Sequence, residues 1–231
     1  MRKFGIIAEG VTDQIVIENI LLGYFDESGL DNDDIGYEQP LLDETDQKRA
    51  PEAAGWGMVF KYFELGKFKA AFQFYEHLIV QIDTDVSEQK GYNVPWREEG
   101  RELTPEELVA RVVMRLTSLL SVEERAQYGE RFIFAVAVHG IECWLLPLFH
   151  DSKKAEKTTG CLKSVDHELT RKNQPTLVKG EHKLPRSYAK ASAPYAEPAR
   201  LRKLYDKNPS LRIFVENLGA LGSKAALTAR P

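Results

Sequence analysis

Cysteine is scarce in this sequence, and no long apolar segment is uninterrupted. Cys143 and Cys161 are the two cysteines. They form no CxxC motif and have no histidine at zinc-ligand spacing, so neither a disulfide framework nor a structural zinc site is indicated. The longest apolar run, 132–149, contains His139 and Glu142, and an uncompensated carboxylate is costly in lipid. The first residues lack the apolar segment of a secretory signal. These absences favour a cytoplasmic protein without a membrane span.

The composition is that of a folded globular protein, but the charge is unevenly distributed. Hydrophobic residues make up 43% of 231 residues, which suits one main core. Residues 1–150 hold 27 acidic and 14 basic side chains, a net charge of −13, whereas residues 151–231 hold 8 and 17, a net charge of +9. An acidic part concentrates cations and a basic part attracts a polyanion. Alternatively, the two parts simply pack against each other.

Short apolar runs alternate with helical patterns along the chain. Buried strands are expected at residues 3–8, 77–82 and 132–138, with a short peripheral strand at 35–42. Helices are expected at residues 12–24, 55–74, 104–120, 199–205 and 210–218. This alternation predicts a mainly parallel sheet flanked by helices. We expect one domain over residues 1–150, with an irregular insertion at about 26–55, and a basic helical and loop extension over residues 151–231.

An acidic residue follows each of the three predicted buried strands. Glu9 follows the first strand, Asp83 and Asp85 follow the second, and Glu142 follows the third. Loops at the carboxyl ends of parallel strands share one edge of the sheet, so these side chains are expected to converge. Asp13 lies just inside the first helix and can turn toward the same edge. Each acid also has a simpler explanation in a helix start or a turn, but together they predict a site for divalent cations.

The segments Glu9-Gly10-Val11-Thr12-Asp13 and Asp83-Thr84-Asp85 resemble the signature of the Toprim superfamily, a lone glutamate followed by a D-x-D pair. The first segment is most similar to Toprim domains of overcoming-lysogenization-defect nucleases and of small stand-alone bacterial relatives. Glu38–Pro40, Ile141–Leu146 and Asn208–Phe214 resemble segments of an uncharacterised Toprim-like family. The resemblance implies a Toprim-like, Rossmann-like α/β sheet and a site for one or two Mg²⁺ or Mn²⁺ ions. The metal ligands that it implies are Glu9, Asp13, Asp83 and Asp85, with Glu142 as an added candidate.

The same resemblance implies a metal-dependent nuclease that hydrolyses phosphodiester bonds of DNA or RNA. Bacterial defence against phage or mobile elements would be its setting, with an ABC-type ATPase as a partner. Catalysis would use Glu9, Asp83 and Asp85 together with a basic residue that no adjacent motif fixes. Lys163, Lys183, Lys190 and Lys224 are the candidates for that basic residue, and Lys224 is assigned the catalytic role. The phosphate backbone is expected to be held by Lys163, Lys183, Arg186 and Lys190.

Two other functions remain open on the sequence. Asp83–Ser87 resembles the nucleophile loop of haloacid-dehalogenase-like phosphatases, although the further acidic pair of that family is missing. A non-catalytic or partner-activated subunit of an ATPase complex is the other alternative; the chain has no Walker-type loop, so ATP hydrolysis would need another chain. His139 and His150 are candidate general bases or hydrogen-bonded structural histidines. A homo-oligomer is left open.

Overall fold

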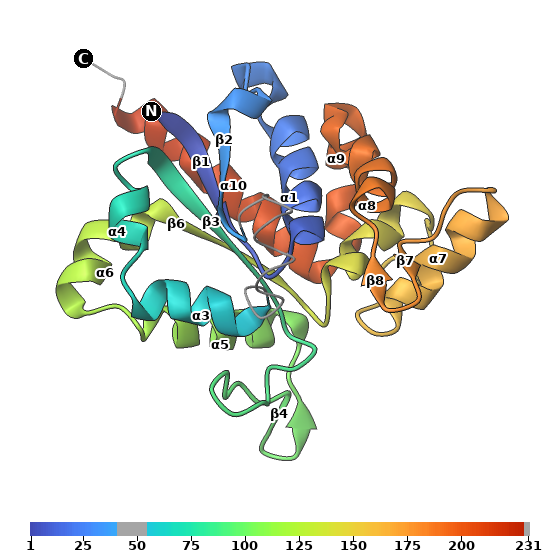
Figure 1. Ribbon diagram of the computed structural model, residues 1–231, viewed down its shortest axis with the longest axis horizontal. Coiled ribbons are helices and arrows are strands. Elements are labelled where there is room, and N and C mark those ends of the chain that lie inside the picture. The colour runs from blue at the N-terminus through green and yellow to red at the C-terminus, as the bar shows by residue number, and fades with distance from the viewer. Residues whose placement is uncertain (41–54, 229–231) are drawn as a thin grey trace.

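A four-stranded, all-parallel sheet forms the centre of the protein (Figure 1). The computed structural model describes residues 1–40 and 55–228, with side chains up to residue 221. The strand order is β2–β1–β3–β6, with β1 at Arg2–Ile7, β2 at Ile35–Gln39, β3 at Tyr75–Asp83 and β6 at Phe132–Ala137. The three predicted buried strands are confirmed, and the predicted peripheral strand is confirmed as the edge strand β2.

Helices cover both faces of this sheet, as the alternating pattern predicts (Figure 1). The helix α1 (Val11–Tyr24) and the helix α10 (Pro209–Thr228) cover one face, and α3 (Trp56–Glu64) and α5 (Pro105–Thr117) cover the other. Neighbouring strand residues alternate between the two resulting cores, so Ile79 packs with the α1 side and Val80 with the α3 side. The observed class is therefore α/β, with a parallel sheet between two helical layers.

The helix predicted over residues 55–74 is wrong in its length. The chain forms α3 and a separate short helix, α4 (Phe68–Ala71). Gly66 lies between them with φ of 61°, a left-handed conformation that glycine adopts without a steric cost and that ends a helix. Phe74, expected in the core with the other aromatic residues of this segment, is 64% exposed. By contrast, α5 begins at the predicted position, where Thr104 and Glu107 form a capping box.

Several short elements connect these layers. The 3-10 helices are η1 (Asp26–Ser28), η2 (Asn32–Asp34), η4 (Gly129–Arg131), η5 (Ile141–Leu148), η6 (Ala193–Ala196) and η7 (Tyr205–Lys207). The helix α6 spans Val122–Tyr128, and a hairpin of β4 (Arg97–Glu98) and β5 (Arg101–Glu102) projects from the body (Figure 1). No helix among the described residues is both long enough and apolar enough to span a bilayer.

The basic C-terminal part packs on the first part and shares its core. It contains α7 (Cys161–Arg171), the hairpin of β7 (Val178–Lys179) and β8 (His182–Lys183), α8 (Pro185–Ser192), α9 (Pro198–Leu204) and α10. The helices α7 and α8 were not expected in this polar, lysine-rich sequence. A side chain on Gly23 of α1 would come within 1.9 Å of the Tyr195 carbonyl oxygen, so α1 and η6 meet backbone to backbone. Ion pairs also join the two parts, at Arg202–Glu27 and Arg212–Glu106.

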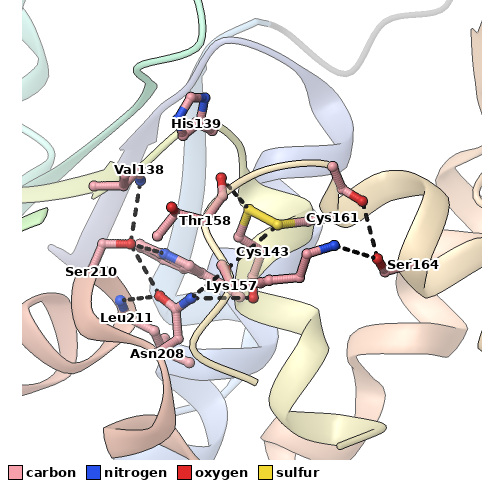
Figure 2. Close-up of a disulfide and its surroundings, with 12 residues drawn as sticks. Val138, His139, Cys143, Lys157, Thr158, Cys161, Ser164, Asn208, Ser210 and Leu211 are labelled. Carbon is pink, nitrogen blue, oxygen red and sulfur yellow. Dashed lines mark hydrogen bonds between the residues drawn. A yellow bond between two sulfur atoms is a disulfide. The ribbon is translucent and has the colours of Figure 1, made fainter. Parts of the chain in front are cut away.

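The two cysteines are joined by a disulfide (Figure 2). The absence of a disulfide indicated by their spacing is therefore wrong. Cys143 lies on η5 and Cys161 is the first residue of α7, and both are buried in one core cluster where these elements pack together. An 18-residue separation in sequence carries no sign of this contact, because the contact depends on tertiary packing.

Candidate active site

Acidic side chains from three loops gather at the carboxyl edge of the sheet, as the sequence predicts. Glu9 follows β1, Asp83 ends β3, and Glu142 lies at the start of η5, after β6. Asp13 occupies the first turn of α1. Ile7 of β1 pairs with Val80 of β3, and Asp83 pairs with Ala137 of β6, so the ends of these strands lie at one edge. Asp13, Asp83 and Glu142 are buried, at 2%, 8% and 7% exposure, which is unusual for carboxylates unless they bind a partner.

Glu9 and Asp83 are joined directly. The Glu9 Oε1 atom accepts a hydrogen bond from the backbone N–H of Asp83 at 2.8 Å. Gln81, buried on β3, links the same two residues: its Oε1 accepts from the Glu9 N–H at 3.1 Å, and its Nε2 donates to Asp83 Oδ1 at 2.8 Å. Gln81 was missed in the sequence, although a glutamine within an apolar strand was a usable signal. This side chain sets the relative position of two acidic loops.

Two glycines allow the carboxylates to approach the backbone. A Cβ atom on Gly10 would lie 2.8 Å from Asp13 Oδ2, closer than real Cβ contacts come. A Cβ atom on Gly140 would lie 2.9 Å from Glu142 Oε2 and 3.4 Å from Asp83 Oδ2. The carboxylates of Asp83 and Glu142 therefore face the same small space beside Gly140. A larger residue at either glycine would displace an acidic side chain of the site.

One lysine reaches this acidic cluster. Lys183, on β8, places its Nζ atom 2.9 Å from Glu142 Oε1. Tyr188, on α8, donates a hydrogen bond from its hydroxyl to the same carboxylate oxygen. The Lys183 side chain remains 41% exposed, so solvent or a ligand can reach it. Tyr188 had no signal in the sequence, because nothing marks a core tyrosine of α8 as the partner of an acid 46 residues earlier.

The other basic candidates lie elsewhere. Lys163, Arg186 and Lys190 are exposed, and none forms an ion pair with Glu9, Asp13, Asp83 or Glu142 in the described part of the chain. The side chain of Lys224 lies outside the described residues. Of the three candidate lysines whose side chains the structure describes, Lys183 is thus the one that forms an ion pair with the acidic cluster.

Negative charge at this edge exceeds what Lys183 neutralises. Burial raises the pKa of Glu9 to about 8, with further contributions from the charges of Asp13 and Asp85. Burial likewise raises the pKa of Asp13 to about 6, and Lys183 opposes that rise. The pKa of Asp83 lies well above its usual value because it is buried and close to Asp13 and Glu9. These directions are those of carboxylates that lack a counterion.

Glu142 behaves differently from these three acids. Burial alone would raise its pKa, but Lys183 and the Tyr188 hydrogen bond outweigh burial and lower it. The pKa of Lys183 is raised in turn: burial would lower it, and the charges of Asp13 and Glu142 more than compensate. Glu142 and Lys183 are therefore a charged pair at the side of an otherwise uncompensated cluster.

Asp85 and His139 lie beside this cluster, whereas His150 lies elsewhere. Asp85 is exposed and its N–H donates to the His139 carbonyl, which places it at the rim. His139 adopts a φ of 62°, and its ring lies 4.8 Å from that of Trp96; burial lowers the pKa of this histidine. His150 lies 3.9 Å from Glu168. These contacts suit structural histidines.

The position of η5, and so of Glu142, is fixed by a buried polar network (Figure 2). The Ser210 hydroxyl accepts from the Val138 N–H at 3.3 Å and from the Trp144 indole at 2.8 Å, and it donates to Asn208. Asn208 in turn donates to the Cys143 carbonyl at 3.5 Å. The segments around residues 141–146 and 208–214, which were grouped in the sequence by resemblance, are therefore in direct contact.

A hard divalent cation suits this donor set. The ligand atoms are carboxylate oxygens, their mutual repulsion is uncompensated, and the buried Asp13 Oδ1 has no hydrogen-bond partner within the described chain. No three acidic, histidine or cysteine side chains among those described already lie at metal-ligand spacing, so a bound ion would draw the carboxylates together.

Comparison of the chain with protein-family models, with curated proteins and with solved structures found no match.

Proposed function

We propose that the protein is a divalent-metal-dependent nuclease that hydrolyses phosphodiester bonds of DNA or RNA. The observation that carries this proposal is the convergence of buried carboxylates from three strand ends, with one partly exposed lysine beside them. Clustered oxygen ligands bind Mg²⁺ or Mn²⁺, and a neighbouring cation stabilises the negative charge of a phosphate in its transition state. The Toprim-like pattern of Glu9, Asp83 and Asp85 supports the same reading.

The acidic side chains and Lys183 would have different roles in this reaction. Glu9, Asp13, Asp83 and Glu142 would hold one or two Mg²⁺ or Mn²⁺ ions, with Asp85 at the rim. A bound ion of this kind supplies Lewis acidity and lowers the pKa of water. Lys183 replaces Lys224 as the proposed catalytic cation, since its ammonium group can turn from Glu142 to donate hydrogen bonds to a phosphate oxygen. Tyr188 keeps Glu142 oriented when Lys183 moves away.

Resemblance alone supports the biological setting. Overcoming-lysogenization-defect nucleases suggest defence against phage or mobile elements and an ABC-type ATPase partner. The exposed Lys163, Arg186 and Lys190 would contact the phosphate backbone, a role that reads charge without reading sequence.

The test compares the wild-type protein with Asp13→Asn, Asp83→Asn and the control Glu64→Gln. Both asparagines keep the side-chain volume, and Glu64 is an exposed carboxylate on α3. Plasmid DNA, single-stranded DNA and total tRNA are incubated with Mg²⁺, Mn²⁺ or chelator. We expect cleavage that needs the metal and falls at least about 100-fold in both site variants, while the control keeps wild-type activity.

Three results would count against the nuclease. Equal cleavage by all four proteins would assign the activity to a contaminant. A phosphorylated Asp83 trapped in a single turnover would favour the phosphatase alternative. The isolated protein could also be inactive with every substrate and metal. Cleavage that then appears only when a copurifying ATPase is present would favour the partner-activated subunit.

A further inference from the structure

A second charged region lies beside α7, and none of the residues that line it belongs to the acidic cluster. A cavity of about 350 Å³ opens to the surface there. We call it the lysine pocket and define it by the side chains that line it: Lys154, Lys157, Lys163, His150, His167 and Ser164. Leu146, four residues after Glu142 on η5, also lines it. The same short helix therefore carries a ligand candidate of the acidic cluster at its start and a wall of the lysine pocket near its end.

Within the described residues, no ion pair neutralises the lysines of the pocket. None of its three lysines is paired with a carboxylate in the described part of the chain; Lys157 instead lies 3.2 Å from the Ser164 hydroxyl. The acidic residue that lines the pocket, Glu168, is bound by Arg171 through contacts of 3.1 and 2.8 Å. Like charges gathered in a concave surface attract an anion of matching charge.

The fold holds these lysines in place. Lys154 and Lys157 belong to the loop before α7, and Lys163 lies on α7 itself. The disulfide joins η5 to the first residue of α7, and Asn208 donates a hydrogen bond to the Lys157 carbonyl at 3.4 Å (Figure 2). Loop and helix are thereby fixed side by side, so the convergence of the lysines is a property of the packed structure.

We propose that the lysine pocket binds the phosphate of a nucleotide, either free or at the end of a nucleic acid strand. Ammonium groups and a serine hydroxyl are hydrogen-bond donors to phosphate oxygens. The volume lies at the lower end of the range of about 300–1,000 Å³ for small-molecule sites, which suits a single nucleotide better than a duplex. The proposal does not depend on nuclease activity at the acidic cluster.

Calorimetric titration in divalent-free buffer tests the pocket without the acidic cluster. The probes are inorganic phosphate, AMP, ADP and a short oligonucleotide with either a 5′-phosphate or a 5′-hydroxyl end. The variants are Lys157→Gln and Lys163→Gln, and the matched control is Lys153→Gln, an exposed lysine of the same loop that does not line the pocket. We expect each pocket variant to weaken phosphate binding about tenfold or more, the usual effect of losing a charged hydrogen bond, with the control unchanged.

The probes separate the two sources of phosphate. Binding of AMP or ADP that is lost in the pocket variants identifies a free nucleotide, whereas selective binding of the 5′-phosphorylated oligonucleotide identifies a strand end. The proposal is overturned if no probe binds, if the pocket variants bind like the wild type, or if Lys153→Gln weakens binding equally. Asp83→Asn should bind the probes like the wild type, so failure of the nuclease proposal would leave this result unaffected.

Discussion

The acidic cluster and the lysine pocket hold excess charge of opposite sign, and η5 borders both. The carboxylates of the cluster are largely buried, whereas the lysines of the pocket are exposed. At the acidic cluster, several carboxylates surround one lysine, Lys183, which pairs with Glu142. In the lysine pocket, three lysines surround one acid, Glu168, which is already bound by Arg171. Each region keeps an excess of one sign that the described chain does not neutralise. An excess of this kind is electrostatically unfavourable in the free protein and becomes favourable when a ligand of opposite charge binds.

The comparison also separates Lys183 from the other lysines of the C-terminal part. Outside the lysine pocket, exposed lysines such as Lys179 and Lys190 contribute to a diffuse positive surface. Lys183, although partly exposed, is held at a fixed point by Glu142 and lies over the ring of Tyr188. A diffuse charge steers a polyanion toward the protein, and a fixed charge can stabilise one particular phosphate oxygen. The two roles should respond differently to mutation.

Removal of the Lys183 charge should have the largest effect. In Lys183→Met, which keeps much of the apolar stem, we expect the proposed nuclease activity to fall about 100- to 1,000-fold, as when a transition-state donor is removed from another enzyme. Lys183→Arg should retain part of the activity because the positive charge remains. The measurement is single-turnover cleavage with saturating Mg²⁺ or Mn²⁺.

Lys179→Met is the matched control for Lys183→Met, because Lys179 lies on β7 of the same hairpin and is exposed. It should keep wild-type activity. Similar losses in Lys179→Met and Lys183→Met would mean that the hairpin contributes only general positive charge, and Lys183 would lose its distinct role.

The sequence anticipates the acidic cluster much better than its lysine. Glu9, Asp83 and Glu142 each lie at or just after the end of a buried strand. The topology of a parallel sheet brings such positions to one edge, regardless of the conformation of the loops. Lys183 arrives on a two-residue strand whose place depends on how α7 and α8 pack, and both helices escaped prediction. Its sequence context does not differ from that of Lys179 or Lys190. Periodic patterns predict helices and strands. They do not predict which side chain of the β7–β8 hairpin will contact the acidic cluster.

The same limit applies to details of the fold. The aromatic spacing over residues 55–74 suits one helix, and the break at Gly66 depends on a backbone conformation that periodicity does not report. Phe74 is exposed although it continues the aromatic pattern. Likewise, the pairing of Cys143 with Cys161 follows from contact between η5 and α7, which is a tertiary event. Local patterns therefore account for the sheet and for the acidic edge, and packing between distant segments accounts for the rest.

Removal of the disulfide should loosen the packing of η5, the short helix that borders both regions. Cys161→Ala removes the link between η5 and α7, and we expect the free energy of unfolding to fall by about 3 kcal/mol, the usual value for a loop of this size. Guanidinium denaturation measures the loss. Binding of phosphate in the lysine pocket should weaken as well, because the loop that carries Lys157 is no longer tied to η5.

A matched control keeps the disulfide and removes an exposed hydroxyl from the same helix. Thr170→Ala on α7 does not touch the lysine pocket and should leave both the stability and the phosphate binding almost unchanged. If thiol labelling of the purified native wild-type protein modifies both cysteines, the disulfide is absent in solution. Cys161→Ala should then have only the smaller effect of losing a buried side chain.

The smallest expected effect is the pH dependence of the free energy of unfolding. It arises from the carboxylates of the acidic cluster. The pKa of Glu9 is raised to about 8 and that of Asp13 to about 6, so the folded protein binds more protons than the unfolded chain just below those values. In the presence of chelator, the free energy of unfolding should therefore fall as the pH rises from about 6 to about 8. The fall is up to about 1.4 kcal/mol per pH unit for each extra proton that the folded protein binds.

Three conditions sharpen this pH dependence. Glu9→Gln should flatten the slope between pH 6 and pH 8, because the group that titrates there is removed, whereas Glu64→Gln should keep it. Saturating Mn²⁺ should also flatten the slope, since a cation compensates the ionised carboxylates. At a fixed pH, phosphate at the lysine pocket should stabilise Glu9→Gln as much as it stabilises the wild type, because Glu9 does not line the pocket. A slope that Glu9→Gln leaves intact would show that the acidic cluster is already compensated in the free protein, and the contrast between its two charged regions would then rest on the lysine pocket alone.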